Sequence, residues 1–218
     1  MLIPGLVEFV VFGLMLFLPA FTFNYWQAWG FLAVLGLSTW IPSIYLLRTN
    51  PVALERRRQG GPTAETRMVQ KVVMGAVWFS LAALVVTSAL DHRFGWSRVP
   101  TAICLVGDVL VAVGLGTAML VVIQNSYAAA TVRVEAGQKL AATGLYGLVR
   151  HPMYTGNVIL MVGIPLALGS YWGLVFVIPG LIALATRIRD EEKLLQEQLD
   201  GYREYAGKVR YRLVPYIW

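Results

Sequence analysis

Six apolar runs, separated by more polar segments of unequal length, divide this sequence. They lie at roughly 4–22, 27–47, 69–90, 99–124, 156–169 and 171–186. The first four approach the roughly 20 residues that a helix needs to cross a hydrocarbon core of about 30 Å. The last two are shorter, and only the breaker-rich stretch 169–173 separates them, which predicts a tight helical hairpin. The pattern therefore predicts an all-α integral membrane protein with about five to six transmembrane helices and a C-terminal helical hairpin.

The basic residues follow the same topology. If all six runs cross the membrane, sixteen of the 18 Lys and Arg residues fall on one side, and only Arg93 and Arg98 fall on the other. The positive-inside rule then puts both ends of the chain and the polar stretches after residues 124 and 186 in the cytoplasm. Because no linker divides the chain, we expect one membrane domain over 1–218, with transmembrane helices in 1–124 and a C-terminal half at 125–218.

Composition narrows the class of protein. Hydrophobic residues make up 57% of the chain and charged residues 14%, against roughly 25% charged residues in an average soluble protein. The net charge of +6 does not indicate nucleic-acid binding, because the basic residues flank the apolar runs and form no basic face. One cysteine, Cys104, excludes an internal disulfide, and two histidines on opposite membrane faces argue against a metal centre. No Rossmann or P-loop glycine motif occurs.

The loop after the second apolar run is basic. It extends from Asn50 to Pro62, begins and ends with turn residues, and carries Arg56, Arg57 and Arg58. A short helix here could lie on the membrane surface and favour anionic headgroups. The same charges could equally serve only to orient the chain in the membrane.

A polar stretch from Gly144 to Gly156 separates the fourth and fifth apolar runs. Arg150 supplies a fixed positive charge, His151 titrates near neutrality, and Pro152 stops a preceding helix. The glycines of this stretch allow a ligand to approach the backbone closely. The stretch could therefore form a binding site, or it could be a connector whose charges are ordinary cytoplasmic flanks of a membrane helix.

A second polar stretch begins at Arg187, where the last apolar run ends. On a continuous helix, Arg187 and Glu191 share one face. The acidic pair Glu191 and Glu192 could belong to a solvated helix stabilised by ion pairs, or one carboxylate could bind ribose hydroxyls or an ammonium group. Spacing alone favours the solvated helix. Because the hairpin begins and ends on one membrane face, we expect this stretch to lie close to Arg150 and His151.

The ordered set of motifs resembles the isoprenylcysteine carboxyl methyltransferase family and its prokaryotic relatives. The resemblance covers about residues 120 to 215. It rests on Gly144-x-Tyr146, Arg150-His151-Pro152-x-Tyr154-x-Gly156, the hairpin, Arg187-x-x-x-Glu191-Glu192-x-x-Leu195 and Tyr202-x-x-Tyr205. The sequence departs from the family at Leu145, where proline is frequent.

The resemblance implies a small helical membrane enzyme that binds S-adenosylmethionine in a cytoplasmic pocket of its C-terminal half. It implies that the cofactor is bound by Gly144, Tyr146, His151, Pro152, Tyr154, Glu191 and Glu192. Arg187 or Arg150 would steer a substrate carboxylate, since arginine holds a carboxylate through a bidentate fork. An apolar, lipid-like or prenylated acceptor would enter from the bilayer, and neither a metal nor nucleic acid would take part.

Three other functions stay open at this point. A phospholipid N-methyltransferase has the same cofactor and a similar motif order. An NADPH-dependent membrane sterol or enone reductase has a similar C-terminal layout. A non-catalytic membrane scaffold would tolerate substitutions between Arg150 and Gly156 apart from effects on membrane insertion.

Overall fold

In the computed structural model, the described residues, 2–58, 65, 67–128, 131–132, 134 and 137–218, form helices and no strands. The α-helices are α1 (Leu2–Ala20), α2 (Trp26–Thr49), α3 (Pro51–Arg58), α4 (Met68–Phe94), α5 (Thr101–Gln124), α6 (Pro152–Ala167), α7 (Val177–Gln198) and α8 (Tyr202–Lys208). Two 3₁₀ turns, Gly144–Gly147 and Trp172–Phe176, precede α6 and α7. The predicted all-α fold is confirmed.

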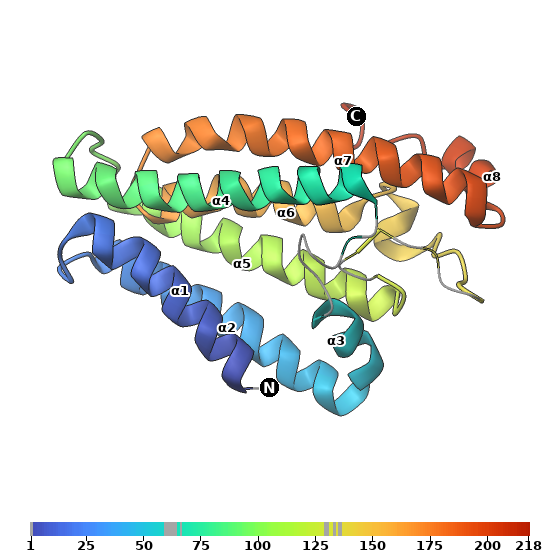
Figure 1. Ribbon diagram of the computed structural model, residues 1–218, viewed down its shortest axis with the longest axis horizontal. Helices are drawn as coiled ribbons and strands as arrows, with labels where there is room; N and C mark the ends of the chain where they lie inside the picture. The colour runs from blue at the N-terminus through green and yellow to red at the C-terminus, as the bar shows by residue number, and fades with distance from the viewer. Residues whose placement is uncertain (1, 59–64, 66, 129–130, 133, 135–136) are drawn as a thin grey trace.

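The long helices form one bundle (Figure 1). In it, α4 packs against α7, and α5 packs against α6. The pair α1 and α2 contacts α4 and α5 along one side. α8 and the 3₁₀ turn at 144–147 lie at one end of this bundle, near the start of α6 and the end of α7 (Figure 1).

Among the described residues, four helical segments are long and apolar enough to cross a membrane: Trp26–Thr49, Met68–Phe94, Thr101–Gln124 and Trp172–Gln198. Gly5–Ala20 and Pro152–Ala167 are apolar but shorter. These six segments correspond to the six predicted apolar runs, so the chain is a multi-pass integral membrane protein. The structure also shows where the pattern misplaced helix ends: α6 begins at Pro152 rather than near 156, because proline suits the first turn of a helix.

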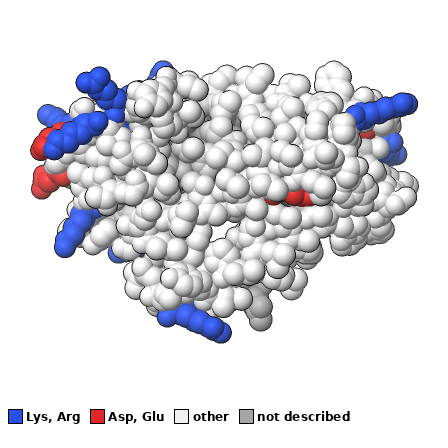
Figure 2. All heavy atoms as spheres, turned by 180° about the vertical axis from the view of Figure 1, so that it is seen from behind, with Lys and Arg blue, Asp and Glu red and all other residues white. Residues whose placement is uncertain are grey.

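The charges lie where such a topology requires them. Arg93 and Arg98 flank the turn between α4 and α5, at the end of the bundle opposite to Gly144–Gly147. Most Lys and Arg side chains on the face in Figure 2 lie toward one end of the molecule, and its middle is nearly free of basic groups.

Glycines let α5 and α6 approach each other closely. A Cβ atom placed on Gly114 would lie 2.7 Å from the carbonyl oxygen of Gly156, and one on Gly156 would lie 2.7 Å from that of Gly114. Gly107 and Gly163 make similar close contacts with the facing helix. Small residues at seven-residue intervals on both helices therefore bring the backbones together, as is typical of membrane helix pairs. This contact fixes the position of α6, whose first residues carry the polar stretch.

The end of the bundle away from α8 is held by buried hydrogen bonds. Asp91 of α4 accepts a hydrogen bond from Ser170 at 2.5 Å and another from Ser97 at 2.6 Å. Tyr25 donates to the carbonyl oxygen of Leu168 at 2.7 Å. These contacts tie the turn of the predicted hairpin to α4 and to the residue before α2, and α7 then returns along α4.

The basic loop after α2 contains the short helix α3, as one of the two interpretations expected, while its location on the membrane surface stays a prediction. Its Ala53 and Leu54 are buried against Leu46 and Val122. The guanidinium of Arg56 lies over the ring of Tyr127, 4.8 Å from its centroid. The side chains of Arg57 and Arg58 and the rest of the loop to Pro62 lie outside the described residues.

Candidate functional site

The two predicted polar stretches meet where α7 passes the first turn of α6. The Nε2 atom of His151 lies 3.2 Å from Oε1 of Glu192. The hydroxyl of Tyr154 donates to Oε2 of Glu191 at 2.5 Å. The predicted proximity of the Arg150 stretch and the acidic pair is therefore confirmed.

Glu192 lies at the centre of a buried ionic cluster. Its Oε1 atom accepts a hydrogen bond from Nε of Arg150 at 2.7 Å, and its Oε2 atom accepts one from Nε of Arg212 at 2.9 Å. Glu192 is only 4% exposed, and Arg150 is 8% exposed. Two guanidinium groups and the His151 ring thus stabilise the ionised form of this carboxyl. Glu192 positions the side chains of Arg150 and His151.

The segment 209–213 completes this cluster, and the sequence patterns did not point to it. The backbone N–H groups of Arg150 and His151 donate to the carbonyl oxygens of Tyr211 and Arg212, both at 2.9 Å. The Nη1 atom of Arg150 also donates to the carbonyl oxygen of Val209 at 2.9 Å. Arg150 therefore uses its guanidinium to hold this segment and Glu192 together.

Arg187 lies in a second buried cluster. Its Nη2 atom lies 2.8 Å from Oε1 of Glu65, and its Nη1 atom donates to the Gln70 side chain at 2.7 Å. Its Nε atom donates to the hydroxyl of Tyr154 at 2.9 Å. Because Tyr154 in turn donates to Glu191, this phenol links the two charged groups. Glu65 precedes α4, and Gln70 lies in its first turn. No sequence motif marked either residue.

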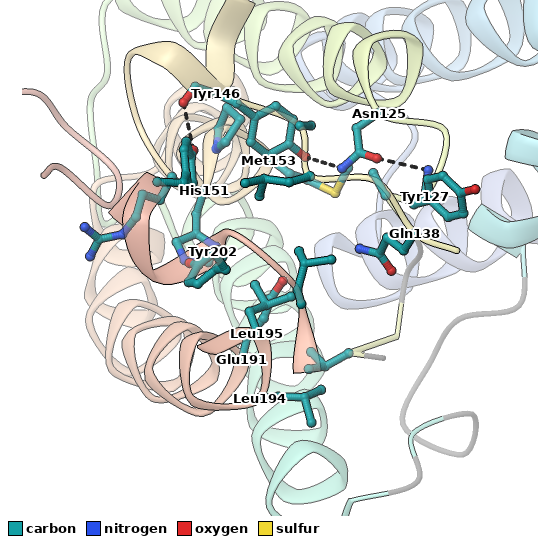
Figure 3. Close-up of a pocket in the computed structure, with 18 of the residues that line it drawn as sticks. Asn125, Tyr127, Gln138, Tyr146, His151, Met153, Glu191, Leu194, Leu195 and Tyr202 are labelled. Atoms are coloured by element: carbon teal, nitrogen blue, oxygen red, sulfur yellow. Dashed lines mark hydrogen bonds between the residues drawn. The ribbon is translucent and has the colours of Figure 1, made fainter. Parts of the chain in front are cut away.

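A cavity opens between these clusters and the segment that follows α5 (Figure 3). Its polar and aromatic lining residues are Asn125, Tyr127, Thr131, Gln138, Lys139, Tyr146, Arg150, His151, Tyr154, Glu191, Tyr202 and Tyr205. Its apolar lining residues are Ala128, Val132, Leu140, Ala141, Pro152, Met153, Leu194, Leu195 and Leu199. The structure thus brings together most of the side chains that the resemblance implied.

Three of the expected site residues lie outside the lining. Glu192 and Arg187 belong to the two clusters behind the wall. Gly144 forms a turn with φ of +62°, and a Cβ atom there would lie 2.7 Å from Oε1 of Gln124. This glycine thus allows the turn that presents Tyr146, since a side chain would be strained and crowded at this position.

Tyr146 is fixed on the cavity wall from both sides. Asn125, the residue after α5, donates from Nδ2 to the Tyr146 hydroxyl at 3.2 Å. The hydroxyl of Tyr205 donates to the backbone carbonyl oxygen of Tyr146 at 2.7 Å. Gln124 accepts a hydrogen bond from the N–H group of Leu145 at 3.0 Å. The end of α5 and the helix α8 therefore hold the 3₁₀ turn in place.

Two hydroxyl groups on the wall lack a hydrogen-bond partner in the part of the chain that the structure describes. The hydroxyl oxygens of Tyr202 and Thr131 are buried and have no hydrogen-bond partner among the described residues. Burial raises the pKa of Tyr202 and of Tyr205 well above the ordinary range of a phenol, and the neighbouring carboxylate of Glu192 adds to this effect. Both phenols are neutral near pH 7, as ordinary phenols also are, and can donate hydrogen bonds.

The cavity can hold a ligand with several kinds of groups. The carboxylate of Glu191 suits hydroxyl or ammonium groups, the tyrosine rings suit a cation or a flat ring, and the leucines suit an apolar surface. Lys139 and His151 on the same wall suit an anionic group, whereas the guanidinium of Arg150 is engaged by Glu192 and Val209. Among the described residues, no set of three or more His, Cys, Asp or Glu side chains could hold a metal ion.

Comparison with known proteins agrees with this picture in outline. Residues 102–200 match the phospholipid methyltransferase family. This range contains both predicted polar stretches, so the predicted likeness to a membrane methyltransferase is confirmed at that level. The narrower assignment to isoprenylcysteine carboxyl methyltransferases stays a prediction.

The chain is also similar to two sterol reductases. It is 32% identical to Delta(14)-sterol reductase TM7SF2 of Mus musculus over 91 residues, which cover 40% of this chain and 22% of the reductase. It is 35% identical to the protein named Probable 7-dehydrocholesterol reductase of Acanthamoeba polyphaga mimivirus over 86 residues, which cover 37% and 19%. The chain thus spans about a fifth of the length of these relatives.

Proposed function

We propose that this protein is an S-adenosylmethionine-dependent methyltransferase that acts on an apolar, membrane-resident acceptor, with an isoprenylcysteine-like carboxylate as the first candidate. The observation that supports it is the composition of the cavity wall, which lies largely within the region similar to phospholipid methyltransferases. The wall places a carboxylate, a histidine ring and several tyrosines beside apolar side chains.

The lining residues fit the parts of the proposed cofactor. Glu191 would bind the ribose hydroxyls or the ammonium group, and His151 or Lys139 would bind the carboxylate. The rings of Tyr146 and Tyr154 would lie near the sulfonium, since aromatic faces attract cations. When bound, the cofactor supplies a methyl group that is already electrophilic. The protein's part is then to orient the acceptor and to exclude water.

The predicted roles of the two arginines take a more specific form. Arg150 binds Glu192 and backbone carbonyl oxygens, and Arg187 binds Glu65, Gln70 and Tyr154. Both guanidinium groups are thus engaged by the protein itself. We propose that they act as positioning residues, Arg150 for His151 and Arg187 for Tyr154, rather than as direct ligands of a substrate carboxylate.

We propose that this end of the bundle faces the cytoplasm. Of the sixteen basic residues predicted to share one membrane side, those whose side chains the structure describes lie on helices and segments near this end. The cofactor would then enter from the cytosol, while a lipid-like acceptor would reach the cavity from the bilayer. We further propose that 1–218 act as one domain, in which the half at 125–218 binds the cofactor.

Calorimetric titration of the purified, folded protein with S-adenosylhomocysteine tests this function. We expect saturable binding that weakens when Glu191 is replaced by Gln. Glu55→Gln, at an exposed position of α3 that does not line the cavity, should leave it unchanged. Absence of binding by the folded wild-type protein would overturn the proposal. Methyl transfer from the labelled cofactor to a farnesylcysteine analogue would identify the acceptor class.

The similarity to two sterol reductases supports a second candidate, a membrane reductase that takes NADPH. Thermal unfolding with each ligand separates the two functions. Protection by NADPH and none by S-adenosylhomocysteine would favour the reductase.

A further inference from the structure

Tyr202, the first residue of α8, has an unusual environment for a buried phenol. Its side chain lines the cavity and is only 3% exposed, yet its hydroxyl has no hydrogen-bond partner among the described residues. Figure 3 shows its ring close to His151, on the side of the cavity where Glu191 lies. Buried polar groups in folded proteins nearly always have a partner. The missing partner of this hydroxyl therefore points to an atom of a bound ligand.

Two other buried tyrosines show that the fold can satisfy such groups. Tyr205, one turn later on α8, donates to the carbonyl oxygen of Tyr146 at 2.7 Å. Tyr25, at the other end of the bundle, donates to Leu168 at the same distance. These two phenols are accounted for by the structure, whereas the Tyr202 phenol is not.

The chemistry around Tyr202 indicates what it would bind. Its hydroxyl is neutral near pH 7, as that of an ordinary phenol is, so it can donate a hydrogen bond. Glu191 lies on the same side of the cavity, and its Oε2 atom is engaged by Tyr154. Its Oε1 atom has no hydrogen-bond partner among the described residues and can accept from a ligand hydroxyl. A donor and an acceptor on one wall match two adjacent hydroxyls of a sugar ring.

We propose that Tyr202 is a ligand-binding residue that donates its hydroxyl hydrogen bond to a ribose oxygen of a nucleoside cofactor, whose neighbouring hydroxyl donates to Glu191. The proposal rests on the proposed function in requiring a nucleoside cofactor in this cavity. It assigns Tyr202 a role in binding the cofactor's ribose, which the motif Tyr202-x-x-Tyr205 does not by itself indicate. A ribose is common to S-adenosylmethionine and NADPH, so the experiment includes both.

The test compares Tyr202→Phe with Tyr205→Phe as the matched control. Tyr202→Phe removes a hydroxyl that bonds to no described group, so the thermal midpoint of the ligand-free protein should stay unchanged or rise. Its affinity for S-adenosylhomocysteine should fall roughly 3- to 10-fold, the loss of one neutral hydrogen bond. Tyr205→Phe removes the bond to Tyr146, so its ligand-free midpoint should fall.

A ligand that lacks one ribose hydroxyl completes a double-mutant cycle between Tyr202 and the ribose. For one of the two deoxy forms of S-adenosylhomocysteine, 2′ or 3′, wild type and Tyr202→Phe should have the same affinity. That form lacks the ribose oxygen to which Tyr202 donates. If wild type binds the parent compound and Tyr202→Phe binds it equally well, the proposal fails while the proposed function stands. If only NADPH binds and Tyr202→Phe weakens it, the proposal holds and the methyltransferase function fails. Binding of neither compound by wild type overturns both.

Discussion

Replacing Glu192 by Gln tests whether Glu192 stabilises the fold while Glu191 binds the ligand. Glu192 and Arg150 are both nearly fully buried, and the distance between their charged atoms is 2.7 Å. Removing one partner of a buried ion pair costs about 3–5 kcal/mol, because the other charge is left uncompensated. Arg212 is about one-third exposed, so its contact with Glu192 is screened and adds little.

For a chain of this size, such a loss lowers the thermal midpoint by roughly 6–20 °C. We expect Glu192→Gln to show this decrease in the ligand-free protein, followed by tryptophan fluorescence in detergent. Binding of S-adenosylhomocysteine should weaken as a consequence, since Arg150 and His151 lose their common partner.

Glu191→Gln is the matched control. The amide oxygen can still accept the hydrogen bond from Tyr154, so the midpoint should fall much less than in Glu192→Gln. The affinity for S-adenosylhomocysteine should fall more, because Glu191 lines the cavity. A Glu192→Gln protein that melts with the wild type but loses ligand binding would refute the positioning role of Glu192.

Three further predictions concern stability. Gly114→Val should lower the unfolding free energy by about 1–3 kcal/mol, because its Cβ would press on a backbone oxygen of α6. Gly116→Val is the control, since a Cβ at Gly116 has open space and should have little effect in the same thermal assay. Equal midpoints of the two variants would contradict the close packing. Glu65→Gln should cost about 3 kcal/mol by leaving Arg187 without this buried counter-charge, and a wild-type midpoint would contradict that pairing. Because the pKa of Tyr202 is raised in the folded state, unfolding releases its proton above about pH 10. The thermal midpoint should therefore decrease above this pH, and less steeply in Tyr202→Phe. The same decrease of the midpoint with pH in both proteins would count against the raised pKa.

Much of the site follows from local sequence. Arg150, His151 and Tyr154 lie next to one another and precede an apolar run, so their common location at a helix start could be read directly. Glu191 lies one turn beyond Arg187 on a continuous helix, as the spacing predicted. The expected meeting of these stretches followed from the predicted hairpin, whose two ends were placed on the same membrane face.

The different roles of Glu191 and Glu192 could not be read from the sequence. Adjacent residues on a helix point about 100° apart, so one carboxylate lines the cavity and the other faces the segment 209–213. Which residue does which depends on how α7 is rotated against α6, and long-range packing sets that rotation. The resemblance placed both residues in the cofactor pocket, whereas the structure places only Glu191 on its wall.

The sequence by itself determined the membrane-spanning helices, because apolar length and breaker residues are local properties. It also determined which residues could carry chemistry. Only the tertiary structure decided the partners of the buried charges: Glu65 for Arg187, and Arg212 for Glu192. These residues have no local signature, since an ion pair between distant segments depends on geometry that no short motif encodes. The unpaired hydroxyl of Tyr202 likewise became evident only once its surroundings were assembled.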